Sequence, residues 1–422
     1  MEGPAAFVSP SLGRRAVDRR ESGLLLSHAM QPIADPSPEP QPPVSEPGEP
    51  AAPRGAPADP PAEARDASAA PRPRRRTGPP SLFGLTPDEF GSRLVEHGHP
   101  RYRGHQVLDW VYRKRVRDPE RMTNVSRKLR ESLAGLVSLA LPEVAEVRVS
   151  RAQDAAKFVL RLHDGERIES VAMRSRRGVT LCLSSQAGCG MRCAFCATGA
   201  MGLRRNLRPE EIVAQVAHML EATGWEDPGY NLVFMGMGEP LANYAQVVKA
   251  IRILNHQDGL AVGARRITVS TVGLVPQIRR LSREGMQLGL AISLHATTDE
   301  KRRQIVPLNE RYGIEDILAA ARDYAAKLGR RVTIEYVLLA GENDTHDDAN
   351  RLAALARSVP CKVNLIPYNP VPHLPWKRPT EPTVQRFADW LAPRSPAVTV
   401  RWSQGTDIWA ACGQLGSRAS GR

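Results

Sequence analysis

The stretch VTLCLSSQAGCGMRCAFCATGAMG, residues 179–202, begins as an apolar β-strand and ends in a glycine-flanked loop that carries three cysteines. Cys189, Cys193 and Cys196 have C-x3-C-x2-C spacing. Three thiolates this close in sequence can bind a zinc ion or an iron–sulfur cluster, because both take soft sulfur ligands. Structural zinc is normally closed by four protein ligands, and no further Cys or His follows within ten residues. A cluster held by three cysteines leaves one iron open for a non-protein ligand.

Short β-rich runs alternate with amphipathic helical windows from this stretch onward. We expect strands at 179–185, 231–236, 266–271, 288–295, 331–339, 362–367 and 397–402. We expect helices at 209–224, 243–256, 274–285, 314–329, 346–359 and 383–392. This alternation predicts an α/β fold in which parallel strands are joined by helical crossovers, as in a full or partial barrel. The chemistry of such folds is expected at the C-terminal strand ends, where the cysteine loop falls.

The first 80 residues differ in composition from the rest of the 422-residue chain. They hold 18 of the 36 prolines and no cysteine, and their ten arginines are balanced by ten acidic residues. Such a segment cannot bury enough apolar surface to offset its ordering entropy, so we expect a disordered tail over 1–80. We also expect the basic run Arg72–Arg76 to be solvated, and removal of the tail to leave activity nearly intact.

Residues 81–140 are expected to form a small basic helical domain. Between Arg101 and Leu133 there are ten Lys and Arg against four acidic residues. Clustered cations attract nucleic acid, and aromatic side chains such as Tyr102 can stack on unpaired bases. The alternative is a solvated helix face with its aromatics in the core, which we favour for Trp110 and Tyr112 taken alone. For the cluster as a whole, RNA binding is the better interpretation.

The remaining divisions and the cellular location follow from composition. We expect a β-rich connecting segment over 141–177, the barrel over 178–416 and a short tail over 417–422. No stretch approaches the ~18 consecutive apolar residues of a membrane helix. Six cysteines are too few for a secreted disulfide scaffold, and the N-terminus lacks a signal-peptide pattern. We therefore expect a cytoplasmic protein that does not associate with membranes.

The cysteine spacing, with Phe195 before the last cysteine, resembles the radical S-adenosylmethionine (SAM) superfamily. Further motifs resemble one family within it, the dual-specificity RNA methyltransferases that methylate carbon 2 of adenosine, called RlmN. These motifs are TLCLSSQAGCGMRCAFCATG, NLVFMGMGEPLANY, ITVSTVG, AISLHA, KVNLIPYNPVP and GTDIWAACGQL. The resemblance covers about residues 82–416. It implies a partial (β/α)6 radical SAM barrel with a small N-terminal helical RNA-binding domain and a disordered tail.

The resemblance also implies the cofactors. One 4Fe–4S cluster would be held by the three cysteines, with its fourth iron bound to SAM, and two SAM molecules would be used per turnover. One electron would cleave SAM to a 5′-deoxyadenosyl radical. The SAM contacts carried over from the family are Gly238, Glu239, Ser270, Ser293, Leu294, His295 and Asn369. Read alone, Gly238 could serve a tight turn and His295 could be structural.

Adenine carbon 2 is electron-poor and has no lone pair, so ordinary electrophilic methyl transfer fails there and a carbon radical is needed. By resemblance, Cys412 is first methylated and then bonds to the base through that methyl carbon. Glu169 would remove a proton, and Cys182 would release the product by forming a transient disulfide with Cys412. Read alone, Cys182 fits a packed strand residue, and Cys361 is assigned to packing.

The family further implies the partners. The substrates would be 23S rRNA near the peptidyl-transferase centre and tRNA at position 37, just 3′ of the anticodon. The electron donor would be flavodoxin-like, and we expect a monomer. One departure from the family pattern is Gln404, where an Arg commonly stands; it puts one RNA contact in doubt.

Two alternatives remain open from the sequence. A related radical SAM enzyme methylates carbon 8 of adenosine and confers antibiotic resistance, and its motifs are shared. The other alternative is a non-catalytic RNA-binding protein with a structural zinc site.

Overall fold

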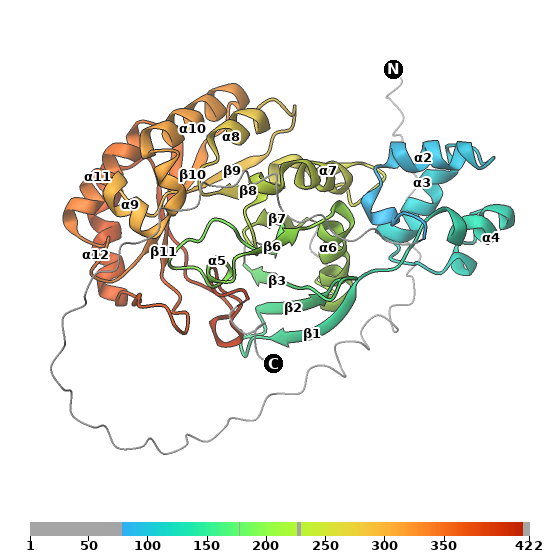
Figure 1. Cartoon of the computed structure of the whole chain (residues 1–422), viewed down its shortest axis with the longest axis horizontal. Helices are drawn as coiled ribbons and strands as arrows, with labels where there is room; N and C mark the ends of the chain where they lie inside the picture. The colour runs from blue at the N-terminus through green and yellow to red at the C-terminus, as the bar shows by residue number, and fades with distance from the viewer. Residues whose placement is uncertain (1–77, 177, 226–228, 417–422) are drawn as a thin grey trace, which may run out of the picture.

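The structure is a computed structural model that describes residues 78–176, 178–225 and 229–416 (Figure 1). The predicted tail over 1–80 lies almost wholly outside these residues, as does the predicted tail over 417–422. Within the described ranges, no helix combines the length and apolar character needed to cross a membrane.

The N-terminal part is a small helical module, drawn in blue and teal in Figure 1. Its elements are η2 (Leu82–Gly84), α2 (Pro87–Glu96), α3 (Arg103–Leu108), the π-helical turn η3 (Asp109–Arg113), η4 (Pro119–Arg121) and α4 (Arg127–Leu136). Helix α2 begins at a capping box, in which the Thr86 hydroxyl accepts from the Glu89 backbone and Glu89 accepts from Thr86 N. Phe83 and Tyr112 pack edge to face in the core at 5.7 Å. The core interpretation of Tyr112 is therefore confirmed.

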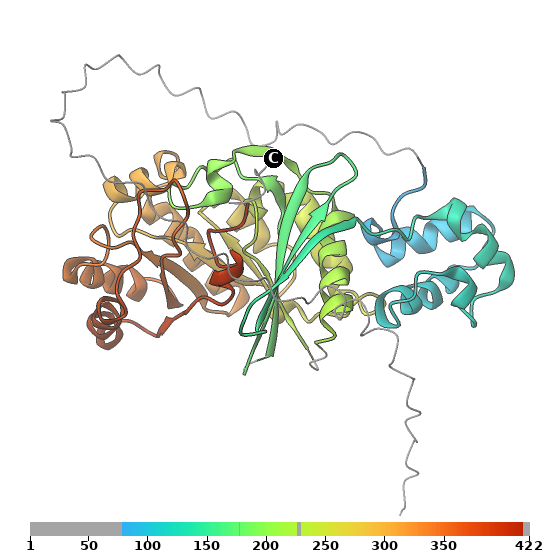
Figure 2. The same cartoon turned by 90° about the horizontal axis from the view of Figure 1, so that it is seen from below.

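Three antiparallel strands join this module to the rest of the chain, as Figure 2 shows. They are β1 (Glu143–Val149), β2 (Ala155–Arg161) and β3 (Arg167–Ser175), and β3 pairs antiparallel with β4 (Gly178–Cys182). Strand β2 is buried along almost its whole length. Helix α6 (Pro209–Thr223) packs near it, and the C-terminal segment contacts it as well, since Lys157 Nζ donates to Trp409 O. The antiparallel strands thus extend the central sheet rather than forming a separate layer.

From β4 onward the strands run parallel. They are β7 (Asn231–Phe234), β8 (Ile267–Thr271), β9 (Gly289–Ser293), β10 (Val332–Leu338), β11 (Cys361–Pro367) and β12 (Val398–Val400). Within the described residues, ten strands form one sheet in the order β1-β2-β3-β4-β7-β8-β9-β10-β11-β12. The sheet curves but does not close, since β1 and β12 are its edges. The α/β fold with a partial parallel barrel is confirmed.

Helices connect the parallel strands. Besides α6 they are α7 (Tyr244–Asn255), α8 (Val275–Leu281), α9 (Asp299–Ile305), α10 (Ile314–Leu328), α11 (His346–Arg357) and α12 (Glu381–Leu391), with 3₁₀ turns η5 (Pro240–Asn243), η6 (Ala264–Arg266), η7 (Pro307–Glu310) and η8 (Ala392–Arg394). The predicted ends at Gly224 and Gly329 are correct, because both glycines cap their helices in the left-handed conformation. The first predicted strand, 179–185, ends early at Cys182, since Ser184 N donates to Gln215 Oε1 of α6 instead of continuing the strand.

A short hairpin, which sequence analysis did not predict, holds the ends of the cysteine loop together. Strands β5 (Gln186–Gly188) and β6 (Leu203–Asn206) pair antiparallel around it, and α5 (Ala197–Ala200) lies between them. Gly188 is required here, because a Cβ would lie 1.9 Å from the carbonyl oxygen of Gly202. The pairing of β5 with β6 therefore holds the two ends of the cysteine loop next to each other.

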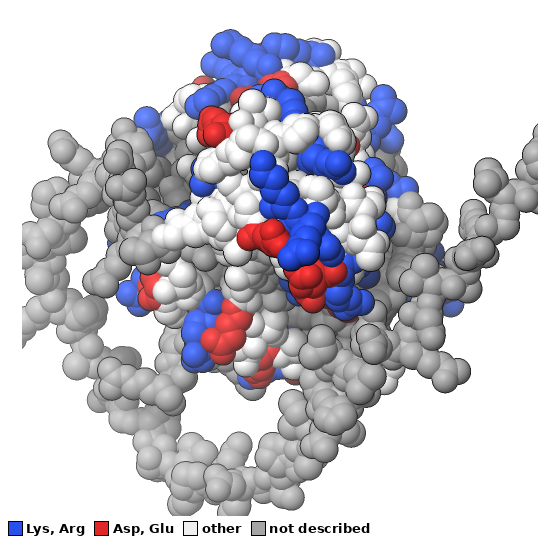
Figure 3. Space-filling view, turned by 90° about the vertical axis from the view of Figure 1, so that its right-hand side faces the viewer, with Lys and Arg blue, Asp and Glu red and all other residues white. Residues whose placement is uncertain are grey.

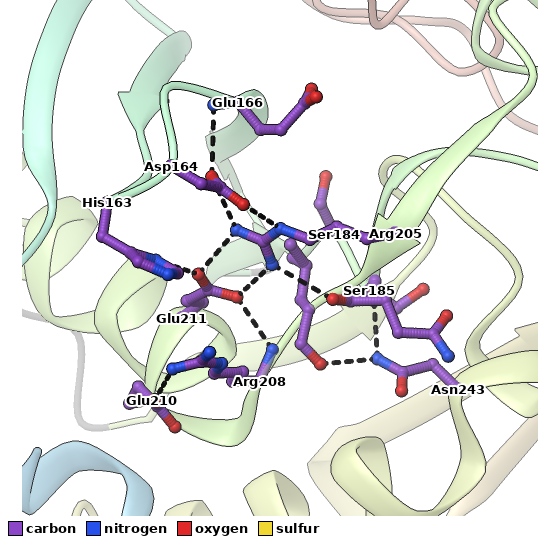
Figure 4. A network of polar contacts seen from close by, with 12 residues as sticks. His163, Asp164, Glu166, Ser184, Ser185, Arg205, Arg208, Glu210, Glu211 and Asn243 are labelled. Carbon is purple, nitrogen blue, oxygen red and sulfur yellow. Dashed lines mark hydrogen bonds and ion pairs between the residues drawn. The ribbon is translucent and has the colours of Figure 1, made fainter. Parts of the chain in front are cut away.

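Arg205 anchors this hairpin to two other elements (Figure 4). Its guanidinium donates to both carboxylate oxygens of Asp164, in the β2–β3 turn, and to both oxygens of Glu211 in α6, at 2.5–3.0 Å. Arg205 is buried, and each of its carboxylate partners is bound bidentately, the strongest geometry for such pairs. The hairpin below the cysteines is thus fixed to both the antiparallel extension and the first barrel helix.

Candidate active site

One cavity of about 220 Å³ opens at the C-terminal ends of the parallel strands. Of the residues singled out from the sequence, those that line it are Cys182, Cys189, Cys193, Cys196, Gly238, Glu239, Ser270, Ser293, His295, Asn369 and Cys412. Leu294 and Glu169 do not line it. The predicted location at the strand ends is therefore correct, and residues more than 200 positions apart in the chain converge there.

The three cysteines of the loop face this cavity with their thiols free. Burial raises the pKa of Cys189 to about 12 and also raises the pKa values of Cys193 and Cys196. Each thiol is therefore neutral unless a metal draws its proton off. Two other segments hold the loop in place, since Ala194 N donates to Ile305 O of α9 and Ala197 N donates to Gly413 O of the C-terminal segment.

The three loop cysteines offer soft sulfur donors to one cavity. In the described ranges no group of three or more His, Cys, Asp or Glu side chains is placed to hold one metal ion. A zinc ion needs all its sulfur ligands at about 2.3 Å from one point, whereas the cysteines around a cluster bind different irons and lie farther apart. Three thiols around one cavity, without a fourth ligand, are consistent with the donor set of a cluster that keeps one open iron.

The GMGEP turn after β7 packs against the strand end of β4. A Cβ on Gly236 would lie 2.7 Å from Leu183 O, and one on Gly238, whose φ is 98°, would lie 2.5 Å from the Gln186 side chain. Glu239 follows, with Oε1 accepting from Leu241 N and Oε2 from Val272 N, both at 3.0 Å. Burial raises the pKa of Glu239 to about 7. The glycines serve the tight turn and also bring Glu239 into the cavity wall.

His295 has a left-handed backbone, with φ of 62°. Its Nδ1 accepts from Val337 N at 3.1 Å, and its ring meets Phe195 edge to face at 4.9 Å. Burial lowers the pKa of His295 to about 3, so the ring is neutral.

Ser270 and Ser293 lie on neighbouring strands, and their hydroxyl oxygens are 3.4 Å apart. Leu294 is fully buried, and its carbonyl oxygen accepts from Arg302 Nε at 2.9 Å.

Arg302 of α9 is a fully buried cation that sequence analysis missed. It donates to the backbone carbonyls of Leu294, Ser293 and Val272, at 2.6–3.2 Å, and to Asn309 Oδ1 at 2.9 Å. Burial lowers the pKa of Arg302 to about 10, partly opposed by nearby Cys193 and Asp299. Arg302 therefore ties two strand ends together and places a positive charge beside the cysteine loop. No sequence signal distinguishes it from the solvated arginine next to it.

The C-terminal segment closes the cavity from the other side. After η9 (Thr406–Ile408) it passes Cys412, which is exposed to the cavity. The segment is bound on the C-terminal side of the cysteine, since Thr198 Oγ1 donates to Leu415 O at 2.7 Å and Gln414 Nε2 donates to Pro370 O at 3.0 Å. A loop rather than a core position was predicted for Cys412, and the structure agrees.

Cys182 and Cys412 both line the cavity and are not bonded to each other. Burial raises the pKa of Cys182 to about 12, and the neighbouring Cys412 contributes to that rise. Cys361 lies elsewhere, fully buried, with its thiol donating to Ala356 O. The packing role predicted for Cys361 matches its position.

Glu169 lies behind the cavity wall. Its carboxylate is buried, 3.4 Å from Lys157 Nζ, and accepts from Gly416 N at 3.1 Å. Lys157 also donates to Trp409 O at 3.2 Å. The pair thus connects the antiparallel strands β2 and β3 to both ends of the segment that carries Cys412.

At the cavity rim lie residues to which sequence analysis gave no role. Trp402 is 47% exposed, with the guanidinium of Arg378 6.0 Å from its ring centroid. Arg401 is exposed beside it. Next to them is Gln404, which sequence analysis linked to RNA contact through the resemblance; it donates to Asp154 Oδ2 and Arg174 O, both at 2.9 Å. Gln404 therefore bonds to the antiparallel extension.

The helical module carries its cations on the outer surface, where Lys and Arg cover much of the face shown in Figure 3 among scattered acidic residues. Several are paired, such as Arg101 with Asp88 and Arg127 with Glu131. Trp110 is half-buried, with Nε1 donating to Asn124 Oδ1. Tyr102 is 56% exposed and is the aromatic best placed to meet a ligand.

Comparisons with known proteins agree on the kind of protein. Two family models match the chain, a ribosomal RNA large subunit methyltransferase N-terminal domain over residues 81–139 and the radical SAM superfamily over residues 183–353. A probable dual-specificity RNA methyltransferase RlmN of Symbiobacterium thermophilum is 44% identical over 80% of this chain and 91% of its own length. The corresponding protein of Thermotoga maritima is 45% identical over 79% of this chain and 97% of its own length. The crystal structure of a radical SAM methyltransferase from Sphaerobacter thermophilus matches with a TM-score of 0.77 and 45% identity, covering 81% of this chain and 100% of that one.

Proposed function

Because this chain belongs to the RlmN family of the radical SAM superfamily, we propose that it is an RNA methyltransferase that methylates carbon 2 of adenosine. The observation that carries the proposal is the meeting of two cysteine sets at one cavity. The loop cysteines form one set, and Cys182 with Cys412 forms the other. A zinc-binding protein without catalysis would have no use for the second set.

We propose that Cys189, Cys193 and Cys196 hold a 4Fe–4S cluster and that SAM binds at its open iron. When bound, the cluster supplies the electron that generates a radical from SAM. Around it, Glu239 offers a carboxylate to an ammonium group, and Ser270, Ser293 and Asn369 offer hydrogen-bonding side chains from three separate strand ends. The buried, neutral His295 lines the cavity beside these side chains, and Leu294, which resemblance also links to SAM, lies buried directly before it. Two SAM molecules would be used per turnover, one to methylate Cys412 and one to generate the radical.

Cys412 is proposed to carry the methyl group and to bond through its carbon to the base. Before that bond forms, the SAM-derived radical would remove a hydrogen atom from the methyl group. The adduct must then lose a proton from carbon 2 and its unpaired electron; Glu169 is the proposed proton acceptor, and the electron would return to the bound cluster. Glu169 lies outside the cavity lining, with Oε2 accepting from Gly416 N, so proton transfer requires the base and this carboxylate to come within hydrogen-bonding reach. In the release step the Cys182 sulfur bonds to the Cys412 sulfur, and the bond from Cys412 sulfur to carbon breaks. The electron pair stays on carbon, which takes up a proton to complete the methyl group, and a thiol reductant restores the cysteines.

The substrates we propose are 23S rRNA near the peptidyl-transferase centre and tRNA at position 37. The helical module over 81–140 would contact the RNA with its outer cations, and the reacting adenosine would leave its stack to enter the cavity. A flavodoxin-like protein is the proposed electron donor, and the enzyme is proposed to act as a cytoplasmic monomer.

The direct test uses the purified holoenzyme with SAM, a reductant and unmodified rRNA and tRNA transcripts. Digested RNA should yield 2-methyladenosine by mass-resolved nucleoside analysis. Formation of 8-methyladenosine would show the related carbon-8 activity instead. Anaerobically purified protein should contain about four iron and four sulfide per chain; stoichiometric zinc in a colourless protein would contradict the proposal.

A further inference from the structure

Glu335, in the middle of β10, has a buried carboxylate oxygen without a hydrogen-bond partner in the described part of the chain. Its Oε1 accepts from Asn364 Nδ2 at 3.0 Å, but Oε2 accepts from no group. The residue is 4% exposed and lines the cavity. A buried polar atom left unsatisfied costs roughly 1–3 kcal/mol, so a donor group of a ligand that reached this oxygen would remove that cost. None of the roles proposed above uses this carboxylate.

Electrostatics place Glu335 near Cys412, one of the two catalytic thiols. Burial raises the pKa values of Cys182, Cys412 and Glu335, and the positive charge of Arg401 opposes the rise in all three. Glu335 in turn contributes to the raised pKa of Cys412. Of the loop cysteines, Cys196 also contributes to the raised pKa of Cys412, whereas Cys193 is affected by Arg302 and Glu239. The free oxygen thus belongs to a residue near Cys412 in the same cavity, and the base must enter that cavity when it bonds to Cys412.

We infer that Oε2 of Glu335 accepts a hydrogen bond from the exocyclic amino group of the target adenine and so selects adenine among the bases. This inference rests on the proposed function. The amino group is a donor that a free carboxylate oxygen can satisfy. Guanine and hypoxanthine carry an oxygen at the same ring position, and two acceptors facing each other in a buried site repel. A site built to hydrogen-bond a substrate group rejects analogues that lack it.

The test replaces Glu335 with Gln. Asn364 continues to donate to the side-chain oxygen, so the new amide nitrogen takes the place of Oε2 and presents a donor to the amino group. Asn364→Ala is the matched control, because it disturbs the same buried pair but leaves the carboxylate facing the cavity. The probes are two synthetic anticodon stem-loops that differ only at the target nucleotide, which is adenosine in one and purine riboside, without the amino group, in the other.

Two quantities are measured for each protein, the dissociation constant for each stem-loop and the kcat/KM for methylation. The wild-type holoenzyme should prefer adenosine by about tenfold or more, the size expected for one charged hydrogen bond. Glu335→Gln should abolish this preference, Asn364→Ala should keep it, and the KM for SAM should stay unchanged in both.

The outcomes separate the two claims. If the wild-type enzyme methylates the adenosine stem-loop but Glu335→Gln still prefers adenosine equally, the inference is wrong while the proposed function stands. A change confined to the KM for SAM would also overturn it, since it would assign Glu335 to SAM. A wild-type holoenzyme that methylates neither stem-loop nor the full transcripts would refute the proposed function itself.

Discussion

Asn369 Nδ2 donates a hydrogen bond of 3.0 Å to the backbone carbonyl oxygen of Cys412. Asn369 follows β11, whereas Cys412 lies on the C-terminal segment. Asn369 Oδ1 accepts in turn from Arg378 at 3.1 Å, which fixes the orientation of the amide. A proposed SAM contact therefore also positions the thiol that the methyl group must reach.

Replacement of Asn369 by Ala should impair both SAM binding and methyl transfer, because it removes a cavity contact and the bond to Cys412 together. Gln414→Ala is the comparison, since Gln414 holds the same segment to Pro370 O without entering the proposed SAM site. We expect Asn369→Ala to raise the KM for SAM and to lower kcat, and Gln414→Ala to lower kcat alone. Equal effects of the two variants on the KM for SAM would count against the double role of Asn369.

Substitutions of Cys412 and Cys182 should give different phenotypes. Cys412→Ala should abolish methyl transfer, because no sulfur remains to carry the methyl group. Cys182→Ala should instead trap protein covalently joined to RNA, visible as a shifted band on a denaturing gel. Cys361→Ala, at a buried thiol outside the cavity, should leave product formation close to wild type. Free methylated RNA at normal yield from Cys182→Ala would contradict its role in release.

Trp402 should contribute to RNA affinity, since it offers an exposed ring at the cavity rim with cations around it. Stacking of one base on an aromatic side chain contributes about 1–3 kcal/mol, so Trp402→Ala should weaken RNA binding by roughly 5- to 100-fold. Trp402→Phe keeps an aromatic face and should recover most of the affinity. Titrations with a labelled stem-loop would measure both. Unchanged affinity in Trp402→Ala would place the RNA elsewhere.

His295 should make stability depend on pH in the mildly acidic range. Its pKa is about 3 in the folded protein and about 6.5 in the unfolded chain. Below about pH 6.5 the unfolded chain binds a proton that the folded protein does not. The free energy of unfolding therefore decreases as the pH is lowered, by up to about 1.4 kcal/mol for each pH unit. This contribution is fully present above pH 6.5 and is lost progressively toward pH 3.

His295→Asn is the variant that isolates this effect. Asparagine tolerates the left-handed backbone, and its side-chain oxygen can accept from Val337 N in place of Nδ1. Urea unfolding at pH 7.5, 6.5 and 5.5 should therefore show a shallower pH dependence for the variant than for the wild type. Parallel slopes would mean that His295 takes up its proton in the folded state as readily as in the unfolded one.

The sequence predicted the barrel well, because parallel strands buried on both faces leave long apolar runs and helix ends such as Gly224 and Gly329 have their own chemistry. The cavity-lining residues were predicted because they occur in compact motifs at strand ends. Arg302 and Glu335 could not be predicted in the same way. Their importance arises from burial and from partners on other elements, which become visible only when the strands are placed side by side. Glu169 and Leu294 were singled out by the resemblance but lie outside the cavity lining.

The sheet from β1 to β12 is an arc with two free edges. A closed barrel has its radius fixed by strand number and stagger, so its mouth cannot widen unless ladder bonds break. An arc can change its curvature through small adjustments of twist between neighbouring strands, with every ladder bond kept. Such a change in curvature can make room for a bulky nucleotide that is still attached to its polymer, without local unfolding around the loop that carries Cys189, Cys193 and Cys196.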